Sequence, residues 1–309
     1  MDIDLVYLWV NGNDPKWNAK RQTFMGDYTE KEESCKGRYV DNEELRYSLR
    51  SVELYAPWIR RIFIVTDDQV PAWLNTSHPK IQMVDHTEII PREYLPCFST
   101  RIIEHHLHKI PGLSEHFLFS NDDMLFNKPV TPETFFAKDS LPLIRMNRRF
   151  LKKWALMYQM KVRGKQLRNY KLVIHNTALL VEKKYGKYYG SRTHHNIDAY
   201  RKSDYAHARE VFDKEISPTL YNRVRSENDI QRNLYSYVAM AEKRGHVCYV
   251  NQYTSFRLDI ENRSMYAKFE KYNPTFFCIN DSQYANDDDR RRAKEFLQQR
   301  FPEKSQFEL

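Results

Sequence analysis

Three short apolar runs, each closed by polar turn residues, constrain the fold of this 309-residue chain more than any other feature. The runs are residues 3–10 (IDLVYLWV), 61–66 (RIFIVT) and 116–121 (HFLFSN), rich in aromatic and β-branched side chains. Such runs are typical of buried central strands. Helical patterns lie between them, and strands that alternate with helices indicate a largely parallel sheet with helices on both faces. We therefore predict an α/β, Rossmann-like fold.

The segments between and after these runs show apolar residues at helical spacing. In residues 41–57, Asp41 is placed to cap a helix. Residues 99–110 repeat the pattern, with Ser99 as the expected cap. A third helix, capped at its start by a serine, is expected over residues 226–243.

The chain is expected to form one domain, because single α/β enzyme domains often reach this length. We assign the sheet core to residues 1–146 and 246–280. A helical part at 147–245 is expected to fold over the sheet as a cap. The charged, amphipathic pattern near the end predicts a terminal helix over residues 287–300.

Composition narrows the choice of partners without identifying one. The 49 Lys and Arg exceed the 41 Asp and Glu, giving a net charge of +8. This charge fits a nucleic acid, a nucleotide-sugar or an acidic membrane face, and a plain basic surface explains it as well. No apolar run is long enough to span a bilayer and no signal peptide opens the chain, so we expect a cytoplasmic protein, with peripheral contact at the inner face of the membrane left open.

The four cysteines are far apart in the sequence and include no CxxC pair, which argues against a zinc motif or a disulfide scaffold. We expect free thiols at all four positions: Cys35, Cys97, Cys248 and Cys278.

Carboxylates and amides follow each of the predicted strands. The three strand ends read NGND at 11–14, TDDQ at 66–69 and NDDM at 121–124. Each alone is explained by an ordinary turn. Ligands of open α/β sheets bind beyond the carboxyl ends of the strands, however, so three such ends on one edge predict a binding site.

Four stretches resemble, in order, the conserved regions of the Stealth family. They are DIDLVYLWVNGNDP, DNEELRYSLRSVELYAPWIRRIFIVTDDQVPAWLN, FLFSNDDMLF and RSENDIQRNLYSYVAM. The family includes bacterial capsular polysaccharide phosphotransferases and the catalytic subunit of the animal N-acetylglucosamine-1-phosphotransferase. The resemblance runs from residue 2 to about residue 240, and the last 70 residues carry little of it.

The resemblance implies a nucleotide-sugar transferase-like fold and a defined reaction. A sugar-1-phosphate, such as that of N-acetylglucosamine, moves from a UDP-sugar to a glycan hydroxyl, leaving a phosphodiester and UMP. Because the donor diphosphate is anionic, the site needs a divalent cation, Mg²⁺ or Mn²⁺. Asp122 and Asp123 are the expected ligands, since Mg²⁺ prefers a few carboxylates. Which of the two binds metal, and which orients or deprotonates the acceptor, stays open.

Further site residues follow from the same resemblance. Asn11, Gly12 and Asp14 are expected to bind the donor, although a turn before a helix explains them too. Asn42 and Arg46 lie one turn apart at the start of the second matching region. Helix capping accounts for them equally well.

The later half of the chain adds further candidates. His195 is the candidate general base. Arg225, with Arg223, precedes an expected helix start and fits a clamp on the diphosphate. Asn176 is expected to border the acceptor pocket, and Asp229 is either a helix cap or a site residue.

Histidines in EHHLH, residues 104–108, invite a metal site. His105 and His108 share a helix face, but no acidic or cysteine ligand accompanies them. We expect structural roles for both.

Two other function classes stay open. A metal-dependent glycosyltransferase would use the same fold, carboxylates and donor, but its acceptor would attack the anomeric carbon and release UDP. A nucleic-acid-binding module would use the basic charge and the many tyrosines, yet no recognition motif is present. Because the long insertions of the animal relatives are missing, we expect a microbial enzyme of capsular or cell-surface polysaccharide synthesis. The sugar, the acceptor and the oligomeric state are not determined by the sequence.

Overall fold

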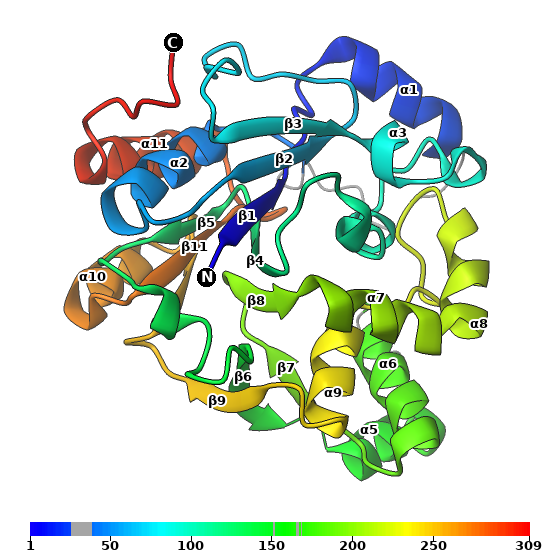
Figure 1. Cartoon of the computed structure of the whole chain (residues 1–309). Coiled ribbons are helices and arrows are strands. Elements are labelled where there is room, and N and C mark those ends of the chain that lie inside the picture. Colours follow the sequence, from blue (N-terminus) through cyan, green and yellow to red (C-terminus); the bar gives the residue numbers. More distant parts are fainter. Residues whose placement is uncertain (26–38, 151, 165–166, 168) are drawn as a thin grey trace.

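The computed structural model describes residues 1–25, 39–150, 152–164, 167 and 169–309 (Figure 1). Cys35 lies outside the described residues. The main sheet has five strands in the order β3-β2-β1-β4-β8, the first four parallel and β8 antiparallel to β4. The strands are β1 Ile3–Leu8, β2 Ile62–Thr66, β3 Ile81–Asp85, β4 His116–Asn121 and β8 Asp198–Arg201.

Both faces of this sheet are covered, which explains why its strands read as continuous apolar runs. Successive side chains of β1 enter different cores: Val6 packs with the cluster on one face, while Leu5 and Tyr7 pack with the cluster on the other. Helix α2 covers the second face, and α4, α7 and α9 contribute to the first. Figure 1 shows these helices on opposite sides of the sheet. The predicted α/β fold is confirmed.

Two smaller three-stranded sheets flank the main one, in the orders β10-β11-β5 and β7-β6-β9. The range 147–245, expected to be helical, contains strands as well as helices, and β8 from this range completes the main sheet. The strands are β5 Met124–Phe126, β6 Leu143–Phe150, β7 Ser191–Thr193, β9 His246–Val250, β10 Ser255–Asp259 and β11 Phe276–Asn280.

The helices match several expected segments, and the last one has the bounds expected for it. No helix among the described residues is long and apolar enough to cross a bilayer. The α-helices are α1 Pro15–Met25, α2 Glu44–Tyr55, α3 His86–Ile89, α4 Thr100–Glu104, α5 Lys153–Lys161, α6 Asn169–Tyr185, α7 Lys202–Val211, α8 Asp213–Ile216, α9 Asn233–Ala241, α10 Arg263–Tyr272 and α11 Asp287–Arg300.

Three expected helix boundaries are wrong, each because a side chain binds the backbone in another way. Helix α2 begins at Glu44, because the Asp41 carboxylate accepts the N–H of Glu43, which has a left-handed φ of 65°. Helix α4 ends at Glu104, where a ring nitrogen of His106 lies 2.9 Å from the carbonyl of Ile102.

The third is the helix expected from Ser226, which begins at Asn233 as α9. The buried Asp229 carboxylate accepts the Ser226 N–H at 2.9 Å, as a cap would. It also accepts from Asn222 and Arg101. These bonds tie the segment to the neighbouring loop and to α4, so the helix starts one to two turns later.

The C-terminal segment is fixed to α2 by a buried ion pair. Glu308 accepts from Arg50 through both carboxylate oxygens, at 2.7 and 2.8 Å, and also from Arg46. These bonds outweigh its burial and lower the pKa of Glu308 to about 2. The neighbouring Phe307 is buried in the core that contains α2. The C-terminal segment therefore holds α2 in place, and with it Asn42 and Glu44 at the start of this helix.

Candidate active site

The strand order of the main sheet reverses beside β1. The chain builds β1, β2 and β3 outwards in one direction and then returns to place β4 on the other side of β1. At such a switch point the loops after the two central strands separate and leave a crevice for a ligand. The residues after β1 and β4 therefore mark where a ligand should bind, and these are the segments 11–14 and 121–124.

The loop after β1 is held to the loop after β2 by one side chain. Gln69 accepts the Asn11 N–H at 2.9 Å, and its amide donates to the Asn11 carbonyl and to Asp14 Oδ2. The Gln69 bond is the main reason that the pKa of Asp14 is lowered. Two of the three predicted donor-binding residues thus stand in a preorganised loop.

Gly12 is required by a close approach within the chain itself. Its N–H donates to the Tyr39 carbonyl at 2.7 Å, and a Cβ at Gly12 would lie 2.0 Å from that oxygen. The backbone at Tyr39 therefore occupies the space beside Gly12 that a close approach of the donor to this glycine would need. The donor-binding role of Gly12 stays a prediction.

Acidic side chains gather beside the end of β4. The pKa of Asp122 is raised well above its usual range, first by burial and then by the charges of Asp123, Glu44 and Asp41. Burial also raises the pKa of Glu44 to about 7, against the hydrogen bonds that Asn42 donates to it. Carboxylates crowded in this way repel one another and attract a cation.

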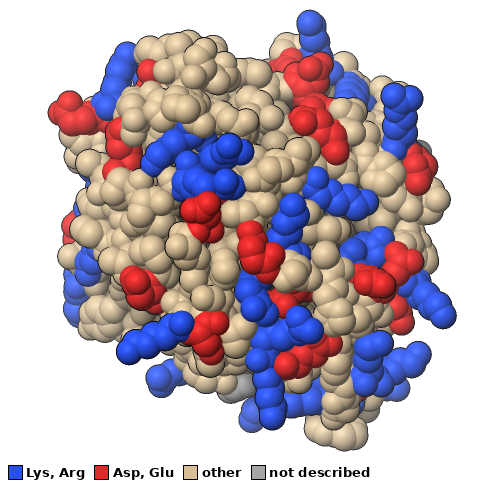
Figure 2. All heavy atoms as spheres, in the orientation of Figure 1, with Lys and Arg blue, Asp and Glu red and all other residues tan. Residues whose placement is uncertain are grey.

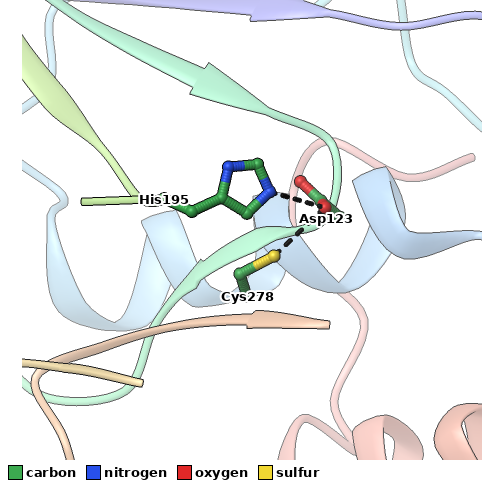
Figure 3. Close-up of side chains that lie close together, drawn as sticks. All are labelled: Asp123, His195 and Cys278. Carbon is green, nitrogen blue, oxygen red and sulfur yellow. Dashed lines mark hydrogen bonds and ion pairs between the residues drawn. The ribbon is translucent and has the colours of Figure 1, made fainter. Parts of the chain in front are cut away.

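Asp123 lies at the centre of a second group of side chains (Figure 3). Its Oδ2 is 3.1 Å from the Cys278 Sγ, which donates to it, and 3.7 Å from the His195 Nε2. Its Oδ1 is buried and has no hydrogen-bond partner. His195 is exposed and lies just before β8, and Cys278 is buried on β11. Three elements far apart in the sequence thus meet at one carboxylate.

A divalent cation fits this arrangement on two grounds. The unpartnered Asp123 Oδ1 is a buried acceptor without a donor, and the neighbouring Asp122 is held in a strongly negative environment. A bound cation would give the Asp123 oxygen a partner and would reduce the repulsion among the carboxylates. Asp123, one of the two predicted ligands, therefore offers a free oxygen for such an ion, and the role of Asp122 as the other ligand stays a prediction.

The two predicted residues at the start of α2 have different partners. Asn42 lies at the site, where its amide binds Glu44 at 2.8 Å. Arg46 points to the C-terminal segment, where it pairs with Glu308 and lies with its guanidinium 5.8 Å from the Trp73 ring centroid. The structure places Arg46 in the contact between α2 and this segment.

The predicted arginines before α9 bind neighbouring loops. Arg223 donates to the carbonyls of Glu93 and Pro96, and Arg225 donates to the Thr100 hydroxyl at the start of α4. Asp229, which is 1% exposed, pairs with Arg101 at 3.0 Å. These bonds show how the segment is fixed, and none of them involves the acidic side chains described above.

The remaining residues singled out from the sequence are Asn176 and the two histidines, His105 and His108. Asn176 lies half-buried on α6, beside His175, whose ring is 2.8 Å from the Tyr188 hydroxyl. His105 is fully buried between Tyr235 and the Ile230 carbonyl, and burial lowers its pKa to about 3. Burial likewise lowers the pKa of His108 to about 4. His105 is held in the core by these hydrogen bonds, and the structural role of His108 stays a prediction.

Sequence reasoning missed three residues of the site: Glu44, Gln69 and Cys278. Glu44 resembles any acidic residue in a first helical turn, and Gln69 resembles a turn residue. Cys278 interrupts the apolar run FFCIN of β11 without breaking its pattern. The signal that could have singled out Cys278 is the polar pair that follows it, Asn280 and Asp281, at another strand end.

Comparison with known proteins bears on the same segments. Residues 1–29 match the family model for Stealth protein CR1, conserved region 1, and residues 38–144 match Stealth protein CR2, conserved region 2. The capsular polysaccharide phosphotransferase fcs1 of Haemophilus influenzae is 36% identical over 295 residues, covering 92% of this chain and 79% of that protein. The chain belongs to the Stealth family. Both matched regions contain strands of the main sheet and the loops that form the site.

Other members of the Stealth family are longer than this chain. The capsular polysaccharide phosphotransferase SacB of Neisseria meningitidis serogroup A is 32% identical, and the match covers 99% of this chain but 57% of SacB. Among solved structures, the galactosyltransferase LgtC in complex with donor and acceptor sugar analogues gives a TM-score of 0.48 at 13% identity, covering 98% of this chain and 96% of that one. This structural likeness is too weak to support an argument about function.

Proposed function

We propose that this Stealth-family chain transfers a sugar-1-phosphate from a UDP-sugar to a glycan hydroxyl in capsular or cell-surface polysaccharide synthesis, releasing UMP. The observation that carries the proposal is the contact of Asp123 with His195 beside the switch point of the sheet. The relatives named above as capsular polysaccharide phosphotransferases support the reaction class.

In this proposal Asp122 and Asp123 hold Mg²⁺ or Mn²⁺. The ion, when bound, neutralises charge on the donor diphosphate and on the phosphorus under attack. The Asp122 and Asp123 carboxylates fix its place at the end of β4. Preorganised loops at Asn11 and Asp14 would position the donor without a further ordering cost, since Gln69 already ties them together.

His195 acts as the general base. Its Nε2 faces the Asp123 carboxylate at 3.7 Å, and the ring is exposed. An Nε2–H directed at Asp123 leaves the lone pair on Nδ1, which can accept the proton of the acceptor hydroxyl as oxygen attacks phosphorus. The carboxylate also stabilises the imidazolium that forms.

We propose the following roles for the other predicted site residues. Arg225 would clamp the diphosphate with Arg223 beside it, and Asn176 would border the acceptor. Asn42 orients Glu44 at the donor side. Arg46 and Asp229 would act indirectly. Arg46 would position α2 through its pair with Glu308, and Asp229 would position the loop before α9 through its pair with Arg101.

The released nucleotide tests the proposal. With Mg²⁺, a glycan acceptor and a panel of UDP-sugars that includes UDP-N-acetylglucosamine, we expect stoichiometric UMP and a ³¹P NMR signal of a phosphodiester in the product. Attack on phosphorus leaves the glycosidic oxygen with the sugar, so the donor's anomeric configuration is retained. Stoichiometric UDP with a phosphorus-free product would instead assign the chain to the metal-dependent glycosyltransferases.

We also propose that the chain contacts the inner face of the membrane through α5. Trp154, Tyr158 and Val162 recur every four residues there and are 77, 51 and 67% exposed. Residues 140–181 contain many Lys and Arg and no Asp or Glu. Lys and Arg side chains gather along the lower edge of the molecule in Figure 2, below the main sheet. Apolar and aromatic side chains with basic neighbours fit an anionic phospholipid surface.

Vesicle binding checks this contact. We expect the protein to sediment with phosphatidylglycerol vesicles but not with phosphatidylcholine vesicles, and less so at high salt, because salt screens the basic side chains. The double change Trp154→Ala and Tyr158→Ala should weaken binding at least fivefold. Tyr284→Ala, at a residue that is 74% exposed elsewhere, serves as the matched control. Equal binding by the double variant and the wild type would contradict the assignment.

A further inference from the structure

Asp123, His195 and Cys278 offer an unusual set of ligand atoms at one point. A carboxylate oxygen, an imidazole nitrogen and a thiol sulfur lie within 4.8 Å of one another. Figure 3 shows the three side chains directed toward one another. The geometry thus brings together one hard, one intermediate and one soft ligand.

This ligand set does not suit the cation of the proposed reaction. Mg²⁺ takes oxygen ligands in an octahedral arrangement and has little affinity for sulfur. Zn²⁺ binds Cys, His and Asp together, usually in a tetrahedral site, and its affinity for a given site exceeds that of Mn²⁺. We infer that Asp123, His195 and Cys278 form a binding site for a zinc-class ion, and that zinc held there inhibits the enzyme.

The exposure of the three side chains allows a metal ion to reach this site. The His195 side chain is 44% exposed and that of Asp123 is 25% exposed. Cys278 is fully buried beneath them, so an ion can arrive from the His195 side and meet the sulfur last. When the metal–sulfur bond forms, the thiol proton leaves to solvent, and the hydrogen bond from Sγ to Asp123 Oδ2 is replaced by coordination to both atoms. A fourth position is left for water.

Zinc at this place would engage both residues that the proposed function uses. Asp123 would no longer be available to Mg²⁺. A metal bound at His195 Nε2, the nitrogen that faces Asp123, would leave the ring proton on Nδ1, so that Nδ1 could no longer accept the proton of the acceptor hydroxyl. The inhibition therefore rests on the proposed function. The binding of zinc does not, because it depends on the three side chains alone.

Metal titration of the purified, metal-free chain tests the binding. We expect one tight Zn²⁺ equivalent in competition with a fluorescent zinc indicator, and a near-ultraviolet thiolate-to-metal band when Co²⁺ is used instead. Cys278→Ser, which preserves size and a donor to Asp123, should weaken zinc binding at least tenfold and remove the Co²⁺ band. Cys248→Ser, at a half-buried thiol on β9, is the matched control and should retain both.

The absence of a tight equivalent in the wild type, or wild-type zinc affinity in Cys278→Ser, would overturn the site. If Cys278→Ser does not fold, His195→Ala, at an exposed side chain, gives the same test of affinity. The transfer assay with Mg²⁺, run before and after addition of Zn²⁺, separates the two proposals, and we expect transfer before the addition and its loss afterwards. No transfer from any UDP-sugar before zinc is added, by a chain that binds zinc, removes the proposed function and leaves the site, whereas transfer by a chain that does not bind zinc does the reverse.

Discussion

Asp123→Asn should lower kcat for sugar-phosphate transfer by at least about a hundredfold while the protein stays folded. Asparagine has nearly the same shape but supplies no negative charge for the cation or for the His195 imidazolium. Asp122→Asn should have an effect of similar size, because its carboxylate is the second expected ligand at the end of β4. Chelation of divalent ions should abolish turnover of the wild type, and added Mg²⁺ or Mn²⁺ should restore it.

The measurement is steady-state kinetics with circular dichroism as the test of folding. Asp288→Asn provides a matched control, because Asp288 is an exposed carboxylate on α11 whose salt-bridge partner is another surface residue, Arg291. Its kcat should equal that of the wild type. Full activity of the wild type in EDTA, or near-normal kcat in both site variants, would exclude the proposed role of the acidic pair.

Arg232→Met should remove about 3–5 kcal/mol from the free energy of unfolding, the largest stability effect that we expect from one substitution. Arg232 is buried under the main sheet, with its guanidinium 2.7 Å from Asp198 and 3.6 Å from Glu104. It also lies 4.1 Å from the Phe119 ring centroid. Methionine fills much of the volume but leaves two buried carboxylates without the counter-charge that Arg232 supplies, so that Glu104 keeps only the charge of Arg101 and Asp198 chiefly that of Arg145.

The pH dependence of this deficit has a defined sign. Burial raises the pKa of Asp198 and of Glu104 even with Arg232 present. Loss of the Arg232 charge raises the pKa of both carboxyl groups further. Carboxylates whose folded pKa exceeds the unfolded value stabilise the fold when protonated, and this contribution is lost as the pH rises. The deficit measured by urea unfolding should therefore be smaller at pH 5 than at pH 8.

A surface ion pair gives the contrast. Arg291→Met removes a pair with Asp288 in which the side chains are 69 and 71% exposed, and should cost less than about 1 kcal/mol at either pH. An Arg232→Met variant as stable as Arg291→Met would show that the buried network contributes little to folding.

The strands that sequence could predict are those buried on both faces. β1, β2 and β4 stand out because successive residues enter different cores, and both cores require apolar side chains. β8 does not stand out, since its four residues begin with Asp198 and end with Arg201. Asp198 is tolerated in the sheet because Arg232 donates a hydrogen bond to it. The residues around Asp198 in the sequence do not predict this partner, which lies far along the chain.

The candidate site likewise contains residues that the local sequence could predict and residues that depend on contacts far apart in the chain. The Asp122–Asp123 pair and His195 could be proposed from the sequence because they occur in short polar segments that resemble those of a known family. Cys278 could not, because its contact with Asp123 depends on the antiparallel pairing of β11 with β5, which sets Cys278 opposite Met124. Glu44 could not, because its pKa reflects burial against Asp122 and Asp41.

The central place of β1 has a consequence for how the chain can be divided. β1 precedes β2 and β4 in the sequence. Its backbone pairs with β2 along one edge and along the other with β4, which begins at His116. A fragment that ends before β4 would present a strand that is apolar except for Asp4, with unpaired backbone groups along one edge, which is a template for pairing between chains. Protein expressed as an N-terminal piece of this kind should aggregate, and a boundary chosen for expression belongs after the segment that completes the sheet at β8.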